Sequence, residues 1–557
     1  MNSARIRPWL APVLLFGLAV VVRLWAAGQI GFPVNEGSAS YVGVARNLVE
    51  GRGLVSDAIW SYATPPLVLP KPAFELWMPM ASFLAAIPMT LLGTTFSAAQ
   101  LSSVLFGAAV APLTWWVARE AARHQGLETH RAAMVALGSG LAAAFLGPFL
   151  VAAAMPDSTT PFLVFGVAAA IAMASMLRRP TIRAGLLLGV LLGLAYLSRQ
   201  EALEFGAAYA LLVVVAVRGQ PGRRLAGAAR LLLSPLAGGL IIVVPWFLRD
   251  LSVFGTLFPG QTLENAYLST NEQIFAYAER PTAATFLAQG PSTIVGHMVG
   301  GLAHDLVNVI VLPGLPVGII GILAVVAMRR APAFRQPTAL QALLVSGLLI
   351  YLVSSLVVPV ATLWGTFLHA SGPLLVGLTV AAMLGLDAAV ARLGRLRGWS
   401  RPNAWLGPLL ALALAIPFAV LQVSVLGQQA SDTKTRLDAI VAQLAALPEI
   451  QATAPAGSVS GNVPQQHAVL ISDHPIWLAE ALRRPVIALP DEPPGEVAAL
   501  GRDFGTVIVV EFDQRGRYPA EWLASDAAPC LAAAPQTLPA PGGSALLVRL
   551  AASCTTP

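Results

Sequence analysis

Long apolar stretches alternate with short arginine-containing segments over the first three quarters of the chain. Each stretch approaches the roughly 20 apolar residues that an α-helix needs to cross the hydrocarbon core of a bilayer. Arginine collects in cytoplasmic loops, so we place these segments on that side. The pattern predicts about 11 membrane-spanning helices, near residues 9–28, 97–118, 132–153, 161–177, 184–198, 203–217, 231–248, 309–328, 339–358, 372–390 and 404–426.

This arrangement puts the N-terminus in the cytoplasm and collects three polar regions on the outer face. They are a first outer loop at about 29–96, a second at about 249–308, and a tail after about 427. The apolar segment 77–93 would invert every later loop if it crossed the membrane, and two prolines interrupt it. We therefore predict an interfacial or re-entrant helix there, with a twelfth span as the alternative.

Composition agrees with a polytopic membrane protein. Of the 557 residues, 56% are hydrophobic and 11% are charged, against about 25% charged in ordinary soluble domains. The net charge of +6 is not gathered into a stripe, which argues against nucleic acid as a partner. We expect a multi-pass protein of the cell (plasma or inner) membrane whose first helix is not cleaved off.

The last part of the chain is charged, rich in proline and typical of a soluble domain. We predict a membrane domain at 1–429 and an extracytoplasmic α/β domain at 430–557. Segment 467–490 has the pattern strand, helix, strand, and 495–512 adds a helix and a strand. No G-x-G-x-x-G loop accompanies them, so no nucleotide site is predicted.

Both cysteines of the sequence, Cys530 and Cys554, lie in this predicted outer domain. An oxidising compartment allows them to pair. We therefore predict a disulfide between them, with two reduced thiols as the alternative.

Charged side chains gather at the predicted outer ends of the helices. A charge near the membrane is energetically costly, so such residues are commonly functional. Carboxylates beside cations at a lipid surface suit displacement of phosphate from a lipid-linked donor. A carboxylate takes the proton of the acceptor hydroxyl, and Arg or Lys stabilises the departing phosphate. The candidates are Glu36, Tyr41, Arg46, Lys71, Glu75, Asp157, Arg199, Arg249 and His369, with Asn35, Arg52, Asp57, Glu201 and Asp250 beside them.

Each candidate also has a structural interpretation. Arg46 and Arg52 could extend to lipid headgroups. Glu36 could cap the helix that starts near Ser38, and Asp157 could cap the next span. The gathering of the whole set on one face is what favours a site.

Several motifs, in order along residues 9–430, resemble the GT-C membrane glycosyltransferases of the family 39 type, related to protein O-mannosyltransferases and lipid-A aminoarabinose transferases. The first outer loop carries an acidic residue, an aromatic and ARNLVEGRGL. It is followed by LPKPAFELWMP, MPDSTTPF, GLAYLSRQEAL and PWFLRDLSVFGTLF. The resemblance implies a GT-C fold. It also implies inverting transfer of a hexosyl or pentosyl group from a polyprenyl-phosphate sugar to a glycan, protein or lipid acceptor.

The resemblance further implies roles for the candidate residues. Glu36 is expected to act as catalytic base, and Asp157 to orient the acceptor. A divalent ion (Mg²⁺ or Mn²⁺) is the one cofactor considered, with Glu36 and Asp157 as its ligands. Lys71 and Arg199 are expected to contact donor phosphate. The remaining expected substrate contacts are Tyr41, Arg46, Glu75, Arg249 and His369.

Asn35 departs from this family's usual Asp-Glu pair. An amide cannot accept a proton at neutral pH, so Glu36, Asp57 or Glu75 takes the role, or the protein is inactive. A non-catalytic protein that binds lipid-linked sugar is therefore one alternative function. A lipid or solute transporter is the other; it predicts mid-membrane ionisable residues and repeated halves, and the sequence pattern indicates neither.

Overall fold

The computed structural model describes residues 9–218, 226–260, 263–399, 403–451, 469–505, 508–513 and 518–551. The chain divides into two compact units. The first unit comprises Met1–Ile30, Trp77–Leu251 and Pro291–Val425, and the second comprises Gly31–Leu76, Ser252–Gly290 and Leu426–Pro557.

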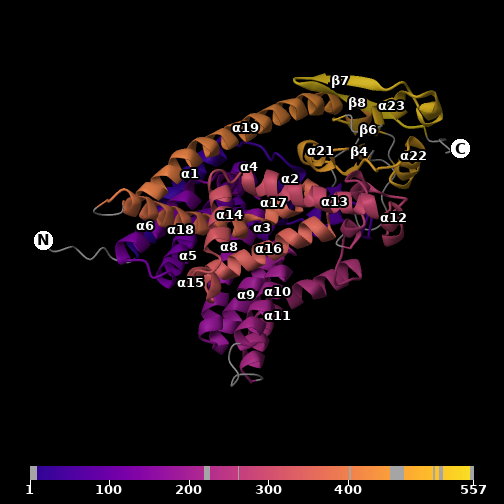
Figure 1. Ribbon diagram of the computed structural model, residues 1–557. Helices are drawn as coiled ribbons and strands as arrows, with labels where there is room; N and C mark the ends of the chain where they lie inside the picture. Colours follow the sequence, from indigo (N-terminus) through magenta and orange to yellow (C-terminus); the bar gives the residue numbers. More distant parts are fainter. Residues whose placement is uncertain are drawn as a thin grey trace. The chain divides into compact units, whose positions relative to one another are not determined.

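The first unit is helical, and α8, α14, α16 and α18 pack beside one another within it (Figure 1). Its elements are α1 (Leu10–Gln29), α3 (Met80–Leu92), α4 (Phe96–Ala108), α5 (Val110–His124), α6 (Thr129–Phe145), α7 (Gly147–Ala154), α8 (Thr159–Arg178), α9 (Ile182–Ser198), α10 (Ala202–Arg218), α11 (Ala226–Phe254), α13 (Pro291–His304), η3 (Asp305–Val311), α14 (Val317–Met328), α15 (Pro332–Arg335), α16 (Ala339–Val357), η4 (Ala361–Trp364), α17 (Thr366–Ala370), α18 (Gly372–Leu396) and the first part of α19 (Leu406–Ala445).

The predicted fold class, a polytopic α-helical membrane protein with a small α/β region, is confirmed. Among the described residues, eight helices are long and apolar enough to cross a membrane, or nine if α6 and α7, which meet at 48°, form one bent span. Three further apolar helices, α3, α9 and α14, are shorter. α3 lies in the predicted non-spanning segment and has 13 residues, fewer than the roughly 20 that a perpendicular crossing needs.

Two predictions for the second half of the membrane region are wrong. The span predicted at 309–328 consists of two elements, because η3 ends and α14 begins on either side of Pro313 and Pro316, and proline interrupts helices. Pro291–Val311, predicted as part of the second outer loop, is itself a candidate span. Its histidines and glycines weaken the apolar pattern by which spans are recognised.

Candidate spans contain ionisable residues that are completely buried, contrary to the expectation that charge gathers at helix ends. Arg23 in α1 and Asp305 in η3 are both fully buried. The Arg23 guanidinium donates hydrogen bonds to the carbonyls of Ala143 (3.1 Å) and Ala144 (3.5 Å). The helix α6 ends at Phe145, so its last carbonyls lack helical partners. Arg23 therefore satisfies the polar backbone exposed by the bend between α6 and α7.

The second unit is built on a six-stranded sheet of order β2-β5-β4-β6-β8-β7. Strands β2, β5, β4 and β6 run parallel, and β8 and β7 add antiparallel neighbours. Its elements are α2 (Glu36–Val49), β1 (Val55–Ser56), β2 (Ala58–Ile59), β3 (Lys71–Pro72), η1 (Glu264–Ala266), η2 (Glu272–Phe275), α12 (Ala283–Ala288), α20 (Pro448–Gln451), β4 (Leu470–Ser472), α21 (Pro475–Leu482), β5 (Val486–Ala488), α22 (Pro494–Asp503), β6 (Ile508–Glu511), α23 (Tyr518–Leu523), η5 (Ser525–Cys530), β7 (Gln536–Ala540) and β8 (Gly543–Arg549).

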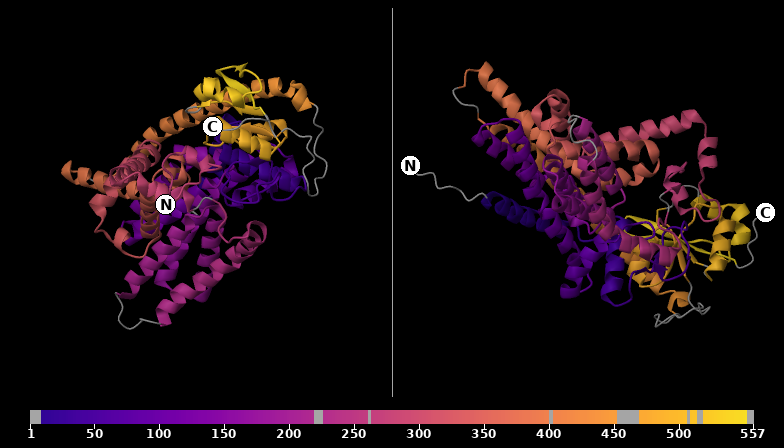
Figure 2. Two further views of the ribbon diagram at one scale, coloured as in Figure 1. Left: turned by 90° about the vertical axis from the view of Figure 1, so that its right-hand side faces the viewer. Right: turned by 90° about the horizontal axis from the view of Figure 1, so that it is seen from below.

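Parts of the two predicted outer loops, residues 31–76 and 252–290, belong to this unit. The first loop supplies edge strand β2 to the sheet of the tail. Figure 2 shows an indigo part of the chain beside the yellow tail in both views. Ile59 and Tyr62 from the first loop and Ile274 and Phe275 from the second lie in the same hydrophobic core as the tail strands. The second unit is thus assembled from three chain segments, whereas the sequence analysis predicted a contiguous domain at 430–557.

The β4–α21–β5–α22–β6 order has the predicted alternation of strands and helices. Cys530 is disulfide-bonded and buried. Cys554, its predicted partner, lies outside the described residues.

Replacing Ile59 with alanine tests whether the first loop stabilises the tail. Ile59 is 0% exposed, and truncating a buried Ile costs about 2–5 kcal/mol. We expect the tail of the purified full-length variant to be cut faster in limited proteolysis. The control is Val68→Ala in the same loop, where the side chain is 49% exposed. Equal cutting of the two variants would contradict the shared core.

Candidate functional site

Asp157, in the first unit, lies in the turn between α7 and α8 and is 5% exposed. Its Oδ1 accepts a hydrogen bond from the backbone N–H of Thr159 at 2.9 Å. Its Oδ2 lies 3.5 Å from Nδ1 of His369. One oxygen therefore accepts the N–H of the first residue of α8, although the N-cap itself is Ser158, and the other oxygen faces an imidazole.

His369 lies in α17, the short helix before α18. Its Nδ1 is 2.7 Å from Oγ1 of Thr159. Burial lowers the pKa of His369, and the nearby Asp157 carboxylate acts in the opposite direction. The imidazole is therefore mainly neutral at pH 7. It shares a hydrogen bond with the Thr159 hydroxyl.

Arg199 follows the end of α9 and brings a cation to the same cluster. Its guanidinium donates to Oγ of Ser158 (2.9 Å) and to the carbonyl of Thr366 (3.3 Å). It also forms a two-point ion pair with Glu201, at 2.6 and 3.2 Å. Such bidentate pairing fixes the plane of the guanidinium. The cluster thus joins turns from three separated parts of the chain.

Buried polar side chains fix the turn that carries Asp157. Gln100 donates to the carbonyls of Ile30 and Ala154, both at 2.8 Å, and so joins the ends of α1 and α7. Thr160 Oγ1 donates to the carbonyl of Ala152 at 2.8 Å. These carbonyls lie at or near helix ends, where helical hydrogen bonds run out. The position of Asp157 is therefore fixed on the α7 side as well as on the α8 side.

Arg249, near the end of α11, pairs with Asp250 at 2.8 Å. Its guanidinium also lies over the ring of Trp246, 4.9 Å from the ring centroid. Its predicted contact with donor phosphate stays a prediction.

Glu36 belongs to the second unit, where both carboxylate oxygens bind N–H donors. Oε1 accepts from the backbone N–H groups of Ile476 (2.8 Å) and Trp477 (3.3 Å), and Oε2 accepts from Nε1 of Trp60 (3.1 Å). Ile476 and Trp477 lie in the first turn of α21, where a negative charge is favourable. Burial raises the pKa of Glu36, whereas His474 and these donors lower it. Glu36 therefore caps a helix of the tail.

Asn35 is the N-cap of α2. Its Oδ1 accepts the backbone N–H of Ser38 at 2.7 Å, and Asn is among the best N-cap residues. The capping role expected for Glu36 at this helix is thus filled by its neighbour. The amide at position 35 has a structural explanation that requires no loss of activity.

Arg46 and Tyr41, both buried, lie on α2. The Arg46 guanidinium binds both oxygens of Glu480, a residue of α21 that lies 434 positions away. Burial raises the pKa of Glu480, and the Arg46 charge lowers it. A Cβ on Gly43 would clash with the carboxylate of Glu480, so a larger residue there would make this side chain shift. Arg46 joins α2 to the tail and does not extend to solvent.

Lys71 is 2% exposed and lies in β3. Its ammonium contacts Glu75 Oε2 at 2.7 Å and the carbonyls of Ser61 (3.2 Å) and Thr64 (3.1 Å). Burial lowers the pKa of Lys71 and raises that of Glu75 to about 7. The lysine and glutamate of the LPKPAFE motif therefore form a buried ion pair.

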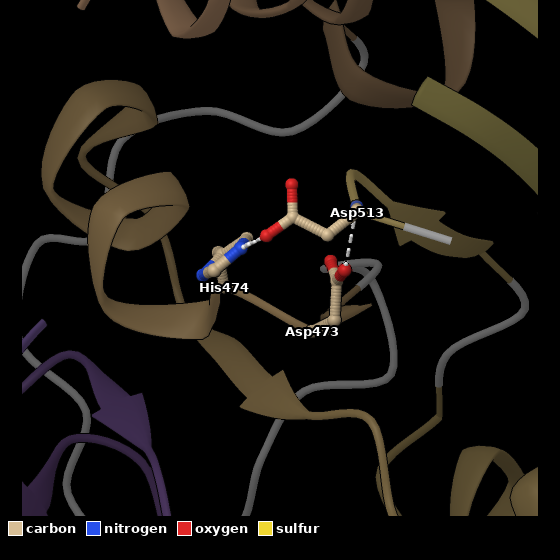
Figure 3. A group of neighbouring side chains, drawn as sticks. All are labelled: Asp473, His474 and Asp513. Atoms are coloured by element: carbon tan, nitrogen blue, oxygen red, sulfur yellow. Dashed lines mark hydrogen bonds and ion pairs between the residues drawn. The ribbon is translucent and has the colours of Figure 1, made fainter. Parts of the chain in front are cut away.

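The predicted metal ligands Glu36 and Asp157 are not in the group of described residues whose geometry suits a metal. That group is Asp473, His474 and Asp513, with ligand atoms all within 4.8 Å of one another (Figure 3). Nε2 of His474 is 2.5 Å from Asp513 Oδ2, and Asp473 accepts the backbone N–H of Asp513 at 3.0 Å.

These hydrogen bonds already use Nε2 of His474 and an oxygen of each aspartate. Arg436 adds a guanidinium to the Asp513 carboxylate at 2.9 Å, and a fixed cation disfavours a second one nearby. Both interactions hold the pKa of Asp513 well below its usual range. The group fits an ion-pair network better than a metal centre.

The sequence did not indicate Glu480, Ser158, Thr159 or the Thr366 carbonyl as contacts of the predicted residues. Ser158 and Thr159 follow Asp157 directly, so the motif PDSTTP contained a usable signal. Glu480 lies in an ordinary amphipathic segment and Thr366 contributes its backbone, so sequence patterns offered no signal for either.

The Glu75 carboxyl should make the stability of the second unit pH-dependent. Its pKa is raised from 4.5 to about 7, so the folded state holds this proton more tightly than the unfolded state. The resulting stabilisation is fully present below pH 4.5 and is lost as pH rises through about 7. We expect Glu75→Gln to reduce the fall in melting temperature between pH 5 and 8. The exposed Glu272→Gln is the control; equal slopes for all three proteins would contradict the assignment.

The sequence and the structure were compared with known proteins. No protein-family model matches the sequence, and no curated protein does. Among solved structures, apo ArnT from Cupriavidus metallidurans is similar with a TM-score of 0.52 and 17% identity, covering 98% of each chain. The same protein bound to undecaprenyl phosphate gives 0.52 and 16%, covering 99% of this chain and 100% of that chain.

The oligosaccharyltransferase of Archaeoglobus fulgidus, in complex with Zn and sulfate, gives a TM-score of 0.51 and 13% identity. The match covers 92% of this chain and 69% of that one. Both proteins are members of the GT-C superfamily. The GT-C fold implied by the sequence resemblance is therefore confirmed: this chain shares its fold with these two proteins.

Proposed function

We propose that this protein transfers a sugar from a polyprenyl-phosphate-linked donor to an acceptor at the outer face of the membrane. The observation that carries the proposal is the cluster of Asp157, Arg199 and His369 in a chain of GT-C fold. A carboxylate, a cation and a neutral imidazole at the ends of membrane helices supply the groups that this transfer needs. The undecaprenyl phosphate bound to ArnT supports a lipid-phosphate donor.

In the proposed reaction, an oxygen or nitrogen of the acceptor attacks C1 of the sugar and a new bond to C1 forms. The bond between C1 and the phosphate oxygen breaks, and its electron pair leaves with the polyprenyl phosphate. The acceptor's proton passes to the carboxylate of Asp157. Arg199 stabilises the phosphate charge, for which a planar guanidinium is well suited. A single displacement of this kind inverts the configuration at C1.

The geometry favours Asp157 over Glu36 as the proton acceptor. Glu36 binds three N–H donors through its two oxygens, and replacing them with an acceptor would uncap α21. Asp157 uses Oδ1 for one backbone N–H, while Oδ2 faces His369. We propose Glu36 as a residue that fixes the first outer loop. Lys71, Arg46, Tyr41, Glu75 and Arg249 remain predicted substrate contacts.

A non-catalytic lipid-sugar binding protein is the second candidate function. It was suggested by the amide at Asn35, but that amide is the N-cap of α2. The substitution therefore no longer favours binding without catalysis over catalysis.

The test is release of polyprenyl phosphate by purified protein from a panel of polyprenyl-phosphate sugars, with membrane-extract acceptors. We expect Asp157→Asn to lower turnover by at least about 100-fold, the lower range for losing a general base. Glu36→Gln keeps one acceptor oxygen and replaces the other with an NH2 donor. We therefore expect a smaller loss of turnover, accompanied by reduced stability.

Asp387→Asn is the matched control, since Asp387 is a buried acid (4% exposed) of the same unit paired with Arg131. It lies 15 positions into α18, about 22 Å along the helix from the cluster end. If the Asp157→Asn variant turns over donor as fast as the Asp387→Asn variant, Asp157 is not the proton acceptor. Donor binding without turnover by any of the proteins would favour the binding function.

A further inference from the structure

Asp305 is a carboxylate inside a candidate membrane span. It begins η3, a π-helical segment that continues α13, and it is fully buried. Ionisable residues at membrane depth are costly and are commonly functional. π-Helical turns inside helices are also frequent at functional sites. The proposed transfer chemistry makes no direct use of this acid.

The Asp305 carboxylate joins three elements of the first unit. Its Oδ2 accepts hydrogen bonds from Oγ of Ser355 in α16, at 2.9 Å, and from Oγ1 of Thr362 in η4, at 2.8 Å. Its Oδ1 lies 3.1 Å from Nδ1 of His304 in α13. One buried side chain therefore fixes the end of α16 and the start of the turn that follows it.

That turn is internally bonded from Thr362 to His369. The N–H of Gly365 donates to the Thr362 carbonyl at 3.0 Å, and the N–H of His369 donates to the Gly365 carbonyl at 3.1 Å. Thr366 Oγ1 donates back to the carbonyl of Ala361 at 3.2 Å. Gly365 has φ of 115°, a conformation that glycine adopts readily. The helices η4 and α17 consequently form one connected segment.

The far end of this segment carries two contacts of the proposed site. His369 binds Thr159 and faces Asp157. The carbonyl of Thr366 accepts from the Arg199 guanidinium. An unbroken series of hydrogen bonds therefore connects the buried carboxylate of Asp305 to the residues that would hold the acceptor and the phosphate.

Stability alone is a weak reason for an acid at this position. Removing a carboxylate from water is costly even after relaxation, whereas each hydrogen bond to a charged group returns part of that cost. Three such bonds about offset the cost. An apolar side chain would fill the space with no desolvation, but it would leave the Thr362 and Ser355 hydroxyls without this acceptor.

We propose that Asp305 is a positioning residue, which holds segment 361–370 so that His369 and the Thr366 carbonyl meet Asp157 and Arg199. Its catalytic consequence rests on the proposed function. The structural link between Asp305 and segment 361–370 does not depend on that function. The test therefore has one arm that needs turnover and one that does not.

The kinetic arm compares Asp305→Asn, Thr362→Val and the double variant in the purified full-length protein. Valine keeps the shape of threonine and removes only the hydroxyl. We expect each single variant to lower kcat by about 10-fold or more with the donor KM little changed, as for loss of transition-state interactions alone. Because both variants act on the same hydrogen bond between Thr362 and Asp305, their losses should not add, and the double variant should lose less than the product of the two single losses. Asp387→Asn should keep kcat near the wild-type value.

The second arm needs no turnover. A nitroxide attached at Leu368→Cys, on the exposed side of α17 (47% exposed), reports the mobility of this helix by electron paramagnetic resonance. We expect a more mobile spectrum in Asp305→Asn and in Thr362→Val, and an unchanged one in Asp387→Asn.

The outcomes separate the two proposals. If the wild-type protein turns over no donor, the proposed function fails, and the spectra alone decide on Asp305. Unchanged spectra in both variants overturn the positioning role, whatever the kinetics show. Additive losses in kcat, or a loosened α17 with unchanged kcat, overturn it as well.

Discussion

Polar groups inside a lipid-embedded helix bundle must find partners within the protein, and the proposed site depends on how this chain meets that requirement. Arg23 serves the carbonyls at the bend between α6 and α7. Gln100 joins the ends of α1 and α7, and Asp305 holds the turn after α16. Each of these buried residues fixes a helix end, and the helix ends carry Asp157 and His369. The constraint that makes polar residues costly here is thus also what places the reactive groups.

The second unit meets a different constraint, because its sheet and core are assembled from segments far apart in the sequence. The strand β2 of the first loop pairs with β5 of the tail. The Glu36 carboxylate caps α21, and Arg46 binds Glu480. Acidic and basic residues that sequence motifs associate with chemistry therefore also hold the first loop against the tail. This dual use explains why the motif residues of that loop are buried and paired.

Much of the fold follows from patterns that act locally. Runs of apolar residues between arginines predicted α1, α8, α16 and α18 within a few residues, because bilayer thickness sets the length of a span. The alternation of strands and helices in the tail was also predicted from its local sequence pattern. The apolar pattern did not predict the span formed by α13 and η3, because histidines and glycines lower the average hydropathy there. It also predicted one span at 309–328, where two prolines divide an otherwise apolar run.

The candidate site could be predicted only in part. Asp157, Arg199 and His369 were named from their places at predicted outer helix ends, and the structure brings them together. The interactions that distinguish Asp157 from Glu36 were not accessible, because they depend on backbone N–H groups of α21 that lie 440 positions away in the chain. Sequence patterns record the type of residue and its local period, whereas pairing across such separations is set by the tertiary fold.

The most direct test of the central claim is stoichiometry. With purified wild-type protein, one donor and one acceptor, the polyprenyl phosphate released and the sugar gained by the acceptor should be measured in the same reaction. The account predicts equal amounts, released only when acceptor is present. Donor that is bound but never cleaved, or that reaches the opposite leaflet intact, would contradict it.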